Sequence, residues 1–162
     1  RFAALRYFNA TGYDIDGQIK GKEKNPANLS PVVMETASGM RDKMLVFGAD
    51  YNTADGTCIR DYIHVNDLAT AHLMAMDYMA TNDKDLLVNL GAGEGYSVLD
   101  VINTAEQVTN KKISYQIVGR REGDPENLVA SSDLAYQLLG WKAQYSDLET
   151  IFKTMAGVYL EK

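Results

Sequence analysis

The sequence predicts an α/β fold, because short apolar stretches of strand length alternate with longer stretches that have helical spacing. Residues 2–8 are apolar at both odd and even positions, which is typical of a parallel strand buried on both faces. The clearest helix spans residues 97–108, where apolar side chains recur every three or four positions. The strands are few and short for a complete doubly wound domain, so we expect an incomplete α/β sheet.

Two polar loops flank the first helix and the strand after it. Residues 12–28 are rich in Gly, Asp, Asn and Lys, and a loop of this length is usually functional or disordered. The pair Ser30-Pro31 predicts the start of a helix, with serine as its cap, and Gly39 predicts its end. A short apolar strand follows, and residues 48–57 form the second loop.

The middle of the chain predicts one strand at residues 59–65 and a helix that Asn66 or Asp67 caps and that runs to about residue 80. Further strands are expected at residues 87–90 and 113–118.

Side-chain caps mark the later helices. Ser97 begins the clearest helix, and Asp100 three positions later completes a capping-box pattern. Ser131 or Ser132 begins a short helix, and Asp147 caps the last one.

Composition narrows the class of protein. A chain of 162 residues suits one domain with one core. It contains no run of 18 apolar residues, so a membrane span is not expected. A net charge of −6 without a Lys/Arg stripe does not suit DNA or RNA. The single cysteine, Cys58, cannot form an internal disulfide, which favours a reducing compartment, the cytoplasm.

A glycine-rich stretch at residues 89–95 follows a strand and precedes a helix, which is the setting of a dinucleotide fingerprint. Its glycine spacing is wrong, and no acidic residue follows about 20 positions later. We therefore expect a tight turn before a capped helix.

Arginines are the candidate binding groups. Arg60 begins a strand, and Arg121 lies in the charged loop 119–127, so each can present its planar fork to a phosphate. Two arginines from separate segments suit a diphosphate. The alternative is that they form structural ion pairs, Arg60 with Asp61 and Arg121 with Glu122.

The chain shows no complete catalytic set. His64, His72 and Asp67 lack the further ligands that a metal site needs, so no metal is expected. No Tyr-x-x-x-Lys, Walker A loop or Ser-His-Asp order occurs in the 162 residues.

Four ordered motifs carry a family resemblance: Leu-Arg-Tyr-Phe-Asn at 5–9, Asp-Gly-Thr-Cys-Ile-Arg-Asp-Tyr-Ile-His-Val at 55–65, Asn-Leu-Gly at 89–91 and Arg-Arg-Glu-Gly-Asp at 120–124. Together they resemble the C-terminal part of the UDP-glucose 4-epimerase family, within the extended short-chain dehydrogenase/reductases. The resemblance implies that residues 1–162 are a UDP-sugar-binding domain. It also implies that the chain begins with an orphan strand of a Rossmann sheet and that the NAD-binding domain is absent.

The resemblance also implies a mechanism. In the family, NAD takes a hydride from C4 of the hexose, a lysine-activated tyrosine removes the hydroxyl proton, and the 4-keto sugar rotates before the hydride returns. This interconverts UDP-glucose and UDP-galactose, and the parent enzyme is expected to be a homodimer. NAD and both catalytic residues belong mainly to the preceding part of the family's chain. We therefore expect this chain to bind substrate and to be inactive alone.

Matching positions assign roles in the substrate site. Arg60 and Arg121 match diphosphate ligands, and Asp124 matches a ligand of the ribose hydroxyls. Leu45 and Phe47 match the strand that meets uracil.

Other matches concern the remaining parts of substrate and cofactor. Val98 matches an apolar contact to uracil, and Tyr7 matches a neighbour of the nicotinamide. Asn9, Asn28 and the backbone of Leu29 match contacts to diphosphate and hexose.

Some alternatives stay open. Leu128 stands where side-chain bulk influences acceptance of N-acetylated sugars, and leucine is intermediate in size. The chain also suits a nucleotide-sugar dehydratase or decarboxylase of the same superfamily, or a non-catalytic nucleotide-sugar-binding module.

Overall fold

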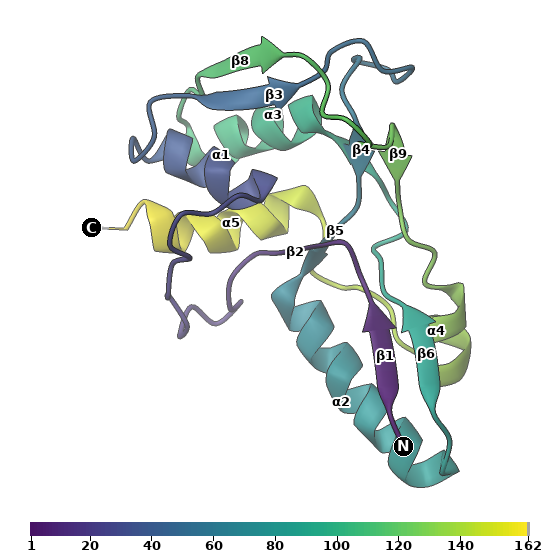
Figure 1. The fold of residues 1–162 in the computed structure, drawn as a ribbon. Coiled ribbons are helices and arrows are strands. Elements are labelled where there is room, and N and C mark those ends of the chain that lie inside the picture. Colours follow the sequence, from purple (N-terminus) through teal and green to yellow (C-terminus); the bar gives the residue numbers. More distant parts are fainter. Residues whose placement is uncertain (162) are drawn as a thin grey trace.

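A computed structural model describes residues 1–161, which form two lobes (Figure 1). The upper lobe consists of α1 (Leu29–Ala37), α3 (Val98–Thr109), α5 (Leu148–Tyr159), β3 (Met44–Phe47) and β8 (Tyr115–Val118). The lower lobe consists of α2 (Val65–Asn82), α4 (Asp133–Leu139), β1 (Ala3–Arg6) and β6 (Leu86–Asn89). Between them lie β2 (Asn9–Thr11), β4 (Ile59–Arg60), β5 (Tyr62–His64), β7 (Tyr96–Ser97) and β9 (Asn127–Leu128). The α/β prediction is confirmed.

Each lobe has its own buried apolar cluster, so the expectation of a single core is wrong. The upper cluster is built around α1, α3, α5 and β3, with Phe152 and Ile151 fully buried. The lower cluster joins α2 to β6 and to Trp141, which follows α4. The reason is topological, because strands of the two lobes pair in separate small sheets rather than in one.

The upper lobe follows the caps that the sequence predicts. The Ser97 hydroxyl accepts from the Asp100 N–H at 3.0 Å while the Asp100 carboxylate accepts from the Ser97 N–H, so the capping box on α3 is confirmed. The Asp147 carboxylate accepts from the Thr150 N–H at 2.8 Å and begins α5. Above these helices, β3 and β8 pair in parallel, with Met44 opposite Tyr115.

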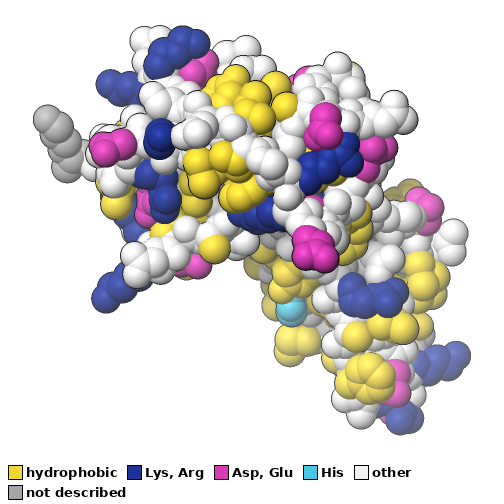
Figure 2. All heavy atoms as spheres, turned by 45° about the horizontal axis from the view of Figure 1, so that its top comes forward, with side chains coloured by type: hydrophobic (Ala, Val, Ile, Leu, Met, Phe, Trp, Pro, Cys, Tyr) yellow, Lys and Arg dark blue, Asp and Glu magenta, His cyan; other side chains and the backbone are white. Residues whose placement is uncertain are grey.

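In the lower lobe, β1 pairs in parallel with β6, and Ala3 lies opposite Leu86. Leu86 is buried against the helices, whereas Leu87 points outward and is 53% exposed. The expectation that the first strand is buried on both faces is wrong, because Ala3, Ala4 and Leu5 of β1 are only half-buried and Arg6 is exposed. Hydrophobic side chains accordingly appear on the surface of this lobe (Figure 2).

The predicted strand at residues 59–65 is instead two strands in different sheets. β4 pairs with β7 and β9, whereas β5 pairs with β2. The break falls at Asp61, whose N–H donates to Leu128 O at 3.3 Å and whose C=O accepts from the Asn9 amide at 2.8 Å. Because the N–H and the C=O of Asp61 bond to different segments, the chain passes from one sheet to the other at this residue.

Two predicted helix starts also need correction. α1 begins one residue before Ser30, with Asn28 as an N-cap whose side chain makes no capping hydrogen bond. α2 is capped by His64, whose Nδ1 accepts from the Asn66 N–H at 3.1 Å. Asp67 instead accepts from the N–H groups of Gln144 and Tyr145, so it holds the loop before α5. Within the described residues no helix is both long and apolar enough to cross a bilayer.

Candidate functional site: a pocket between α1 and β3

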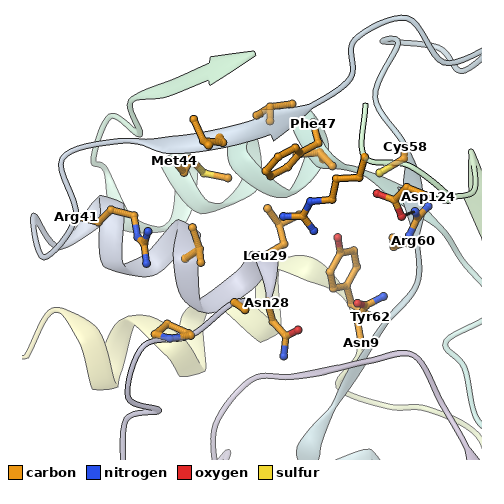
Figure 3. A pocket seen from close by; sticks show the side chains of 17 residues that line it. Asn9, Asn28, Leu29, Arg41, Met44, Phe47, Cys58, Arg60, Tyr62 and Asp124 are labelled. Carbon is orange, nitrogen blue, oxygen red and sulfur yellow. Dashed lines mark hydrogen bonds and ion pairs between the residues drawn. The ribbon is translucent and has the colours of Figure 1, made fainter. Parts of the chain in front are cut away.

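One pocket, with a volume of about 450 Å³, lies between α1, β3 and β4 (Figure 3). Every residue that the resemblance assigned to the substrate lines it: Asn9, Asn28, Leu29, Leu45, Phe47, Arg60, Val98, Arg121 and Asp124. These residues come from six separate segments of the chain. The fold therefore brings together all the positions that the sequence motifs singled out for UDP-sugar contact.

Arg60 is held by residues around it. Its Nη2 donates to Asp124 Oδ1 at 2.6 Å and its Nη1 donates to Ile59 O at 2.7 Å. The side chain is only 12% exposed, so the guanidinium is fixed at the edge of the pocket. The predicted alternative pairing with Asp61 is wrong, because Asp61 is buried elsewhere and accepts from the Ala130 N–H.

Arg121 has a different environment. Its guanidinium carbon lies 3.8 Å from the centroid of the Phe47 ring, a cation–π contact. No carboxylate of the described residues forms an ion pair with it, so the alternative pairing with Glu122 is also wrong. Its neighbour Arg120 leaves the pocket and pairs with Asp50.

The pocket is positively charged although the chain is acidic. Its charged lining consists of Arg41, Arg60 and Arg121 against Asp124, in a chain whose net charge is −6. Such a concentration of guanidinium groups favours an anionic ligand.

One edge of β3 offers backbone groups to the pocket. The N–H groups of Met44 and Gly48 donate to Ser114 O and Val118 O beside β8. Because alternate residues of a parallel strand bond to opposite sides, the N–H and C=O groups of Leu45 and Phe47 lie on the other edge. This edge combines apolar side chains with unpaired backbone donors and acceptors, which suits a flat heterocycle.

Of the lining residues that the sequence did not assign to a ligand, three have polar or charged side chains: Arg41, Cys58 and Tyr62. Tyr62 is buried, and burial raises the pKa of its phenol, so it stays uncharged. Its position two residues after Arg60 was the available signal. Cys58 is also buried, and burial raises the pKa of its thiol, as suits a small packing residue. Arg41 gave no signal, because a charged residue after a helix resembles a solvated one.

Two predicted residues lie outside the pocket. Tyr7 follows β1 and is 39% exposed. Leu128, in β9, lies opposite Arg60 in the strand register but does not line the cavity.

The glycine-rich turn before β7 does not fit a dinucleotide. A Cβ at Gly91 would lie 2.7 Å from Ala130 O, and one at Gly95 would lie 2.6 Å from Ile59 Cγ2. These glycines face other segments of the chain rather than a pyrophosphate. Residues 1–161 also contain no group of three or more His, Cys, Asp or Glu side chains placed to hold a metal.

Comparison with known proteins extends this description. Residues 1–91 match the model of the NAD dependent epimerase/dehydratase family. A UDP-glucose 4-epimerase from Streptococcus mutans is 45% identical over 152 residues, which are 93% of this chain and 45% of that protein.

Solved structures give the same result. The UDP-glucose 4-epimerase of Brucella ovis in complex with NAD superimposes with a TM-score of 0.91 and 45% identity, covering 95% of this chain and 47% of that one. The Bifidobacterium longum enzyme in complex with NAD+ and UDP gives 0.87 and 39%, covering 96% and 46%. The chain thus spans less than half the length of these relatives, and its fold is that of extended short-chain dehydrogenase/reductase epimerases. Because the family model matches more than half of its residues, the chain belongs to the NAD dependent epimerase/dehydratase family.

Proposed function

We propose that this chain binds the UDP part of a UDP-sugar and serves as the substrate-binding part of a UDP-glucose 4-epimerase. The observation that carries the proposal is that Arg60 and Arg121, from separate segments, line one pocket. The same pocket is lined by the apolar side chains of β3. The names of the relatives support the same substrate class.

In this proposal the diphosphate lies between Arg60 and Arg121. Each charge-assisted hydrogen bond to a phosphate oxygen contributes about 1.5–3 kcal/mol. Asp124 keeps one carboxylate oxygen for the ribose hydroxyls while the other accepts from Arg60. The uracil ring lies along the free edge of β3 at Leu45 and Phe47.

The remaining assignments are part of the same proposal. Val98 supplies apolar contact to the base, and Asn28 with the backbone of Leu29 contacts the diphosphate and hexose. The Asn28 side chain makes no capping hydrogen bond on α1, so it is available for a ligand. The side-chain amide of Asn9 already donates one hydrogen bond to Asp61 O, so only its remaining polar groups are available for a ligand.

The proposal assigns the hydride chemistry, and NAD itself, mainly to residues outside these 162. NAD, when bound, would supply the hydride chemistry at C4, and within this chain we propose only Tyr7 as a neighbour of the cofactor. Leu128 stays a candidate for sugar specificity through its register with Arg60. The parent enzyme is proposed to act in the cytoplasm as a homodimer.

Calorimetric titration of the chain with UDP tests the binding site. Arg60→Gln should weaken UDP binding by roughly tenfold or more, because one charge-assisted contact is lost. Arg1→Gln is the matched control, since Arg1 pairs with exposed Asp83 on the lower lobe. Absence of UDP binding, or equal affinity in the Arg60→Gln variant, would contradict the assignment.

A further inference from the structure

A third arginine, Arg41, lines the pocket and has no part in the binding scheme above. It lies in the turn between α1 and β3, at the opposite end of the pocket from Arg60 and Asp124 (Figure 3). A cation at the opposite end of the pocket from Arg60 requires a separate explanation.

The guanidinium of Arg41 is fixed in place. Its Nε and Nη2 both donate to Glu35 Oε2, at 3.0 and 2.8 Å. The N–H groups of Met40 and Arg41 both donate to Glu35 O, so the turn that carries the arginine is closed as well. The Glu35 side chain is only 13% exposed, which limits the motion of the pair.

This arrangement leaves hydrogen-bond donors free at the pocket. The Nη1 amino group forms no hydrogen bond within the described residues, and the apolar residues Val32, Met44 and Leu45 line the same pocket. An orientated donor beside apolar side chains suits a neutral oxygen acceptor on a flat ring. It suits a hydroxyl-rich hexose less well, and Asn9 and Asn28 offer amides for that elsewhere in the pocket.

In the binding scheme proposed above, the base lies along β3 at Leu45 and Phe47, and the turn that carries Arg41 leads directly into this strand. We propose that Arg41 donates to the 4-oxygen of the base and thereby makes the pocket prefer uracil to cytosine. Position 4 carries a carbonyl acceptor in uracil and an amino donor in cytosine, and a guanidinium has no acceptor. With cytosine, two donors face one another in a partly desolvated site, which is the kind of mismatch that rejects an analogue strongly.

The inference rests on the proposed function, and calorimetry with UDP, CDP and inorganic pyrophosphate separates the two. The wild-type chain should prefer UDP to CDP by roughly tenfold or more. The double variant Arg41→Met/Glu35→Gln removes the ion pair without leaving a half-buried carboxylate. It should bring the UDP/CDP ratio close to one while the affinity for pyrophosphate is unchanged. Arg41→Lys keeps the charge but loses the planar fork, so its ratio should also fall.

Lys43→Met is the matched control, because Lys43 is a nearby cation that donates to Gln116 and does not line the pocket. It should keep the wild-type ratio, and thermal unfolding of each variant checks that it is folded. An unchanged ratio in the double variant, or an equal loss for UDP, CDP and pyrophosphate, would overturn the role of Arg41 alone. A wild-type chain that binds neither UDP nor pyrophosphate would overturn the proposed function and this inference together.

Discussion

Arg60 and Arg121 differ in how their positive charge is compensated. Arg60 and Asp124 largely neutralise one another, since their side chains form an ion pair at 2.6 Å. The uncompensated charge therefore belongs to Arg121, which stacks on Phe47 instead of pairing with a carboxylate. In the proposed scheme a diphosphate contacts both guanidinium groups while Arg60 keeps its partner and its orientation.

That Arg60 and Arg121 from separate segments meet at one pocket could be predicted from the sequence, but their partners could not. Neighbouring acids, Asp61 and Glu122, were the plausible local partners. The structure pairs Arg60 with Asp124, 64 positions away, because β9 brings the loop of residues 119–127 alongside β4. Long side chains reach across elements, so local spacing does not decide which charges meet.

Asp61 is a buried carboxyl at the point where the two strands diverge. One oxygen accepts from the Ala130 N–H at 3.0 Å, and the other has no hydrogen-bond partner. Burial raises the pKa of this carboxyl above its ordinary value of 3.8. A proton on the unpartnered oxygen removes the cost of a buried, unpaired charge.

This environment predicts how stability varies with pH. Above pH 3.8 the unfolded chain ionises at Asp61 before the folded chain does, so this residue's contribution to stability falls as pH rises through the raised folded pKa. Asp61→Asn lacks this dependence and keeps an oxygen for Ala130. Its free energy of unfolding, measured in urea, should therefore gain on wild type as pH rises from 3.8 through the raised folded pKa of Asp61, and the gain should level off above that pKa.

The exposed variant Asp16→Asn is the control and should show no such trend. A difference between wild type and Asp61→Asn that stays constant from pH 3.8 upwards would show that folding does not raise the pKa of this carboxyl.

At the scale of elements, side-chain caps decided which boundaries were predictable. α3 and α5 begin at Ser97 and Asp147, whose own side chains cap the helix. The predicted starts of α1 and α2 are wrong. The N-cap of α1 is Asn28, whose side chain makes no capping hydrogen bond. The N-cap of α2 is His64, and histidine is not a common N-cap residue. The strand at 59–65 was misjudged because tertiary partners, not local alternation, break it at Asp61.

The cap of α3 reaches beyond its own helix. The Ser97 hydroxyl accepts from the Asp100 N–H and donates to the carboxylate of Asp55, which in turn accepts from the N–H of Thr57. One hydroxyl thus ties α3, and Val98 with it, to the loop that leads into β4 and Arg60.

Ser97→Ala should lower the free energy of unfolding by about 1 kcal/mol or more, since a cap and a part-buried hydrogen bond to the loop at Asp55 are both lost. Ser132→Ala is the matched control, because Ser132 is the N-cap of α4 but its side chain makes no capping bond. Chemical denaturation compares the two. Equal and negligible effects would show that the hydroxyl of Ser97 contributes nothing to stability.

At the scale of the whole molecule, the types of element could be predicted but not their grouping into two lobes. Periodicity identifies a strand, yet it does not say that β3 pairs with β8, some 70 residues later, while β1 pairs with β6. Nine of the residues that line the pocket could be named from the family resemblance, which matches positions one by one. The third arginine of the pocket could not, because Arg41 enters the pocket only through the turn that joins α1 to β3.

The whole pocket contains binding groups but no group suited to remove a hydroxyl proton at neutral pH. Burial raises the pKa of both Tyr62 and Cys58, and Asp124 is paired with Arg60. We therefore expect the chain of 162 residues to bind UDP-glucose yet to show no epimerase turnover when NAD is supplied. A coupled assay for UDP-galactose formation measures this, with the Arg60→Gln variant as the background. Turnover by the wild-type chain above that background would show that a catalytic base lies within these residues and that the chemistry was assigned to the wrong part of the enzyme.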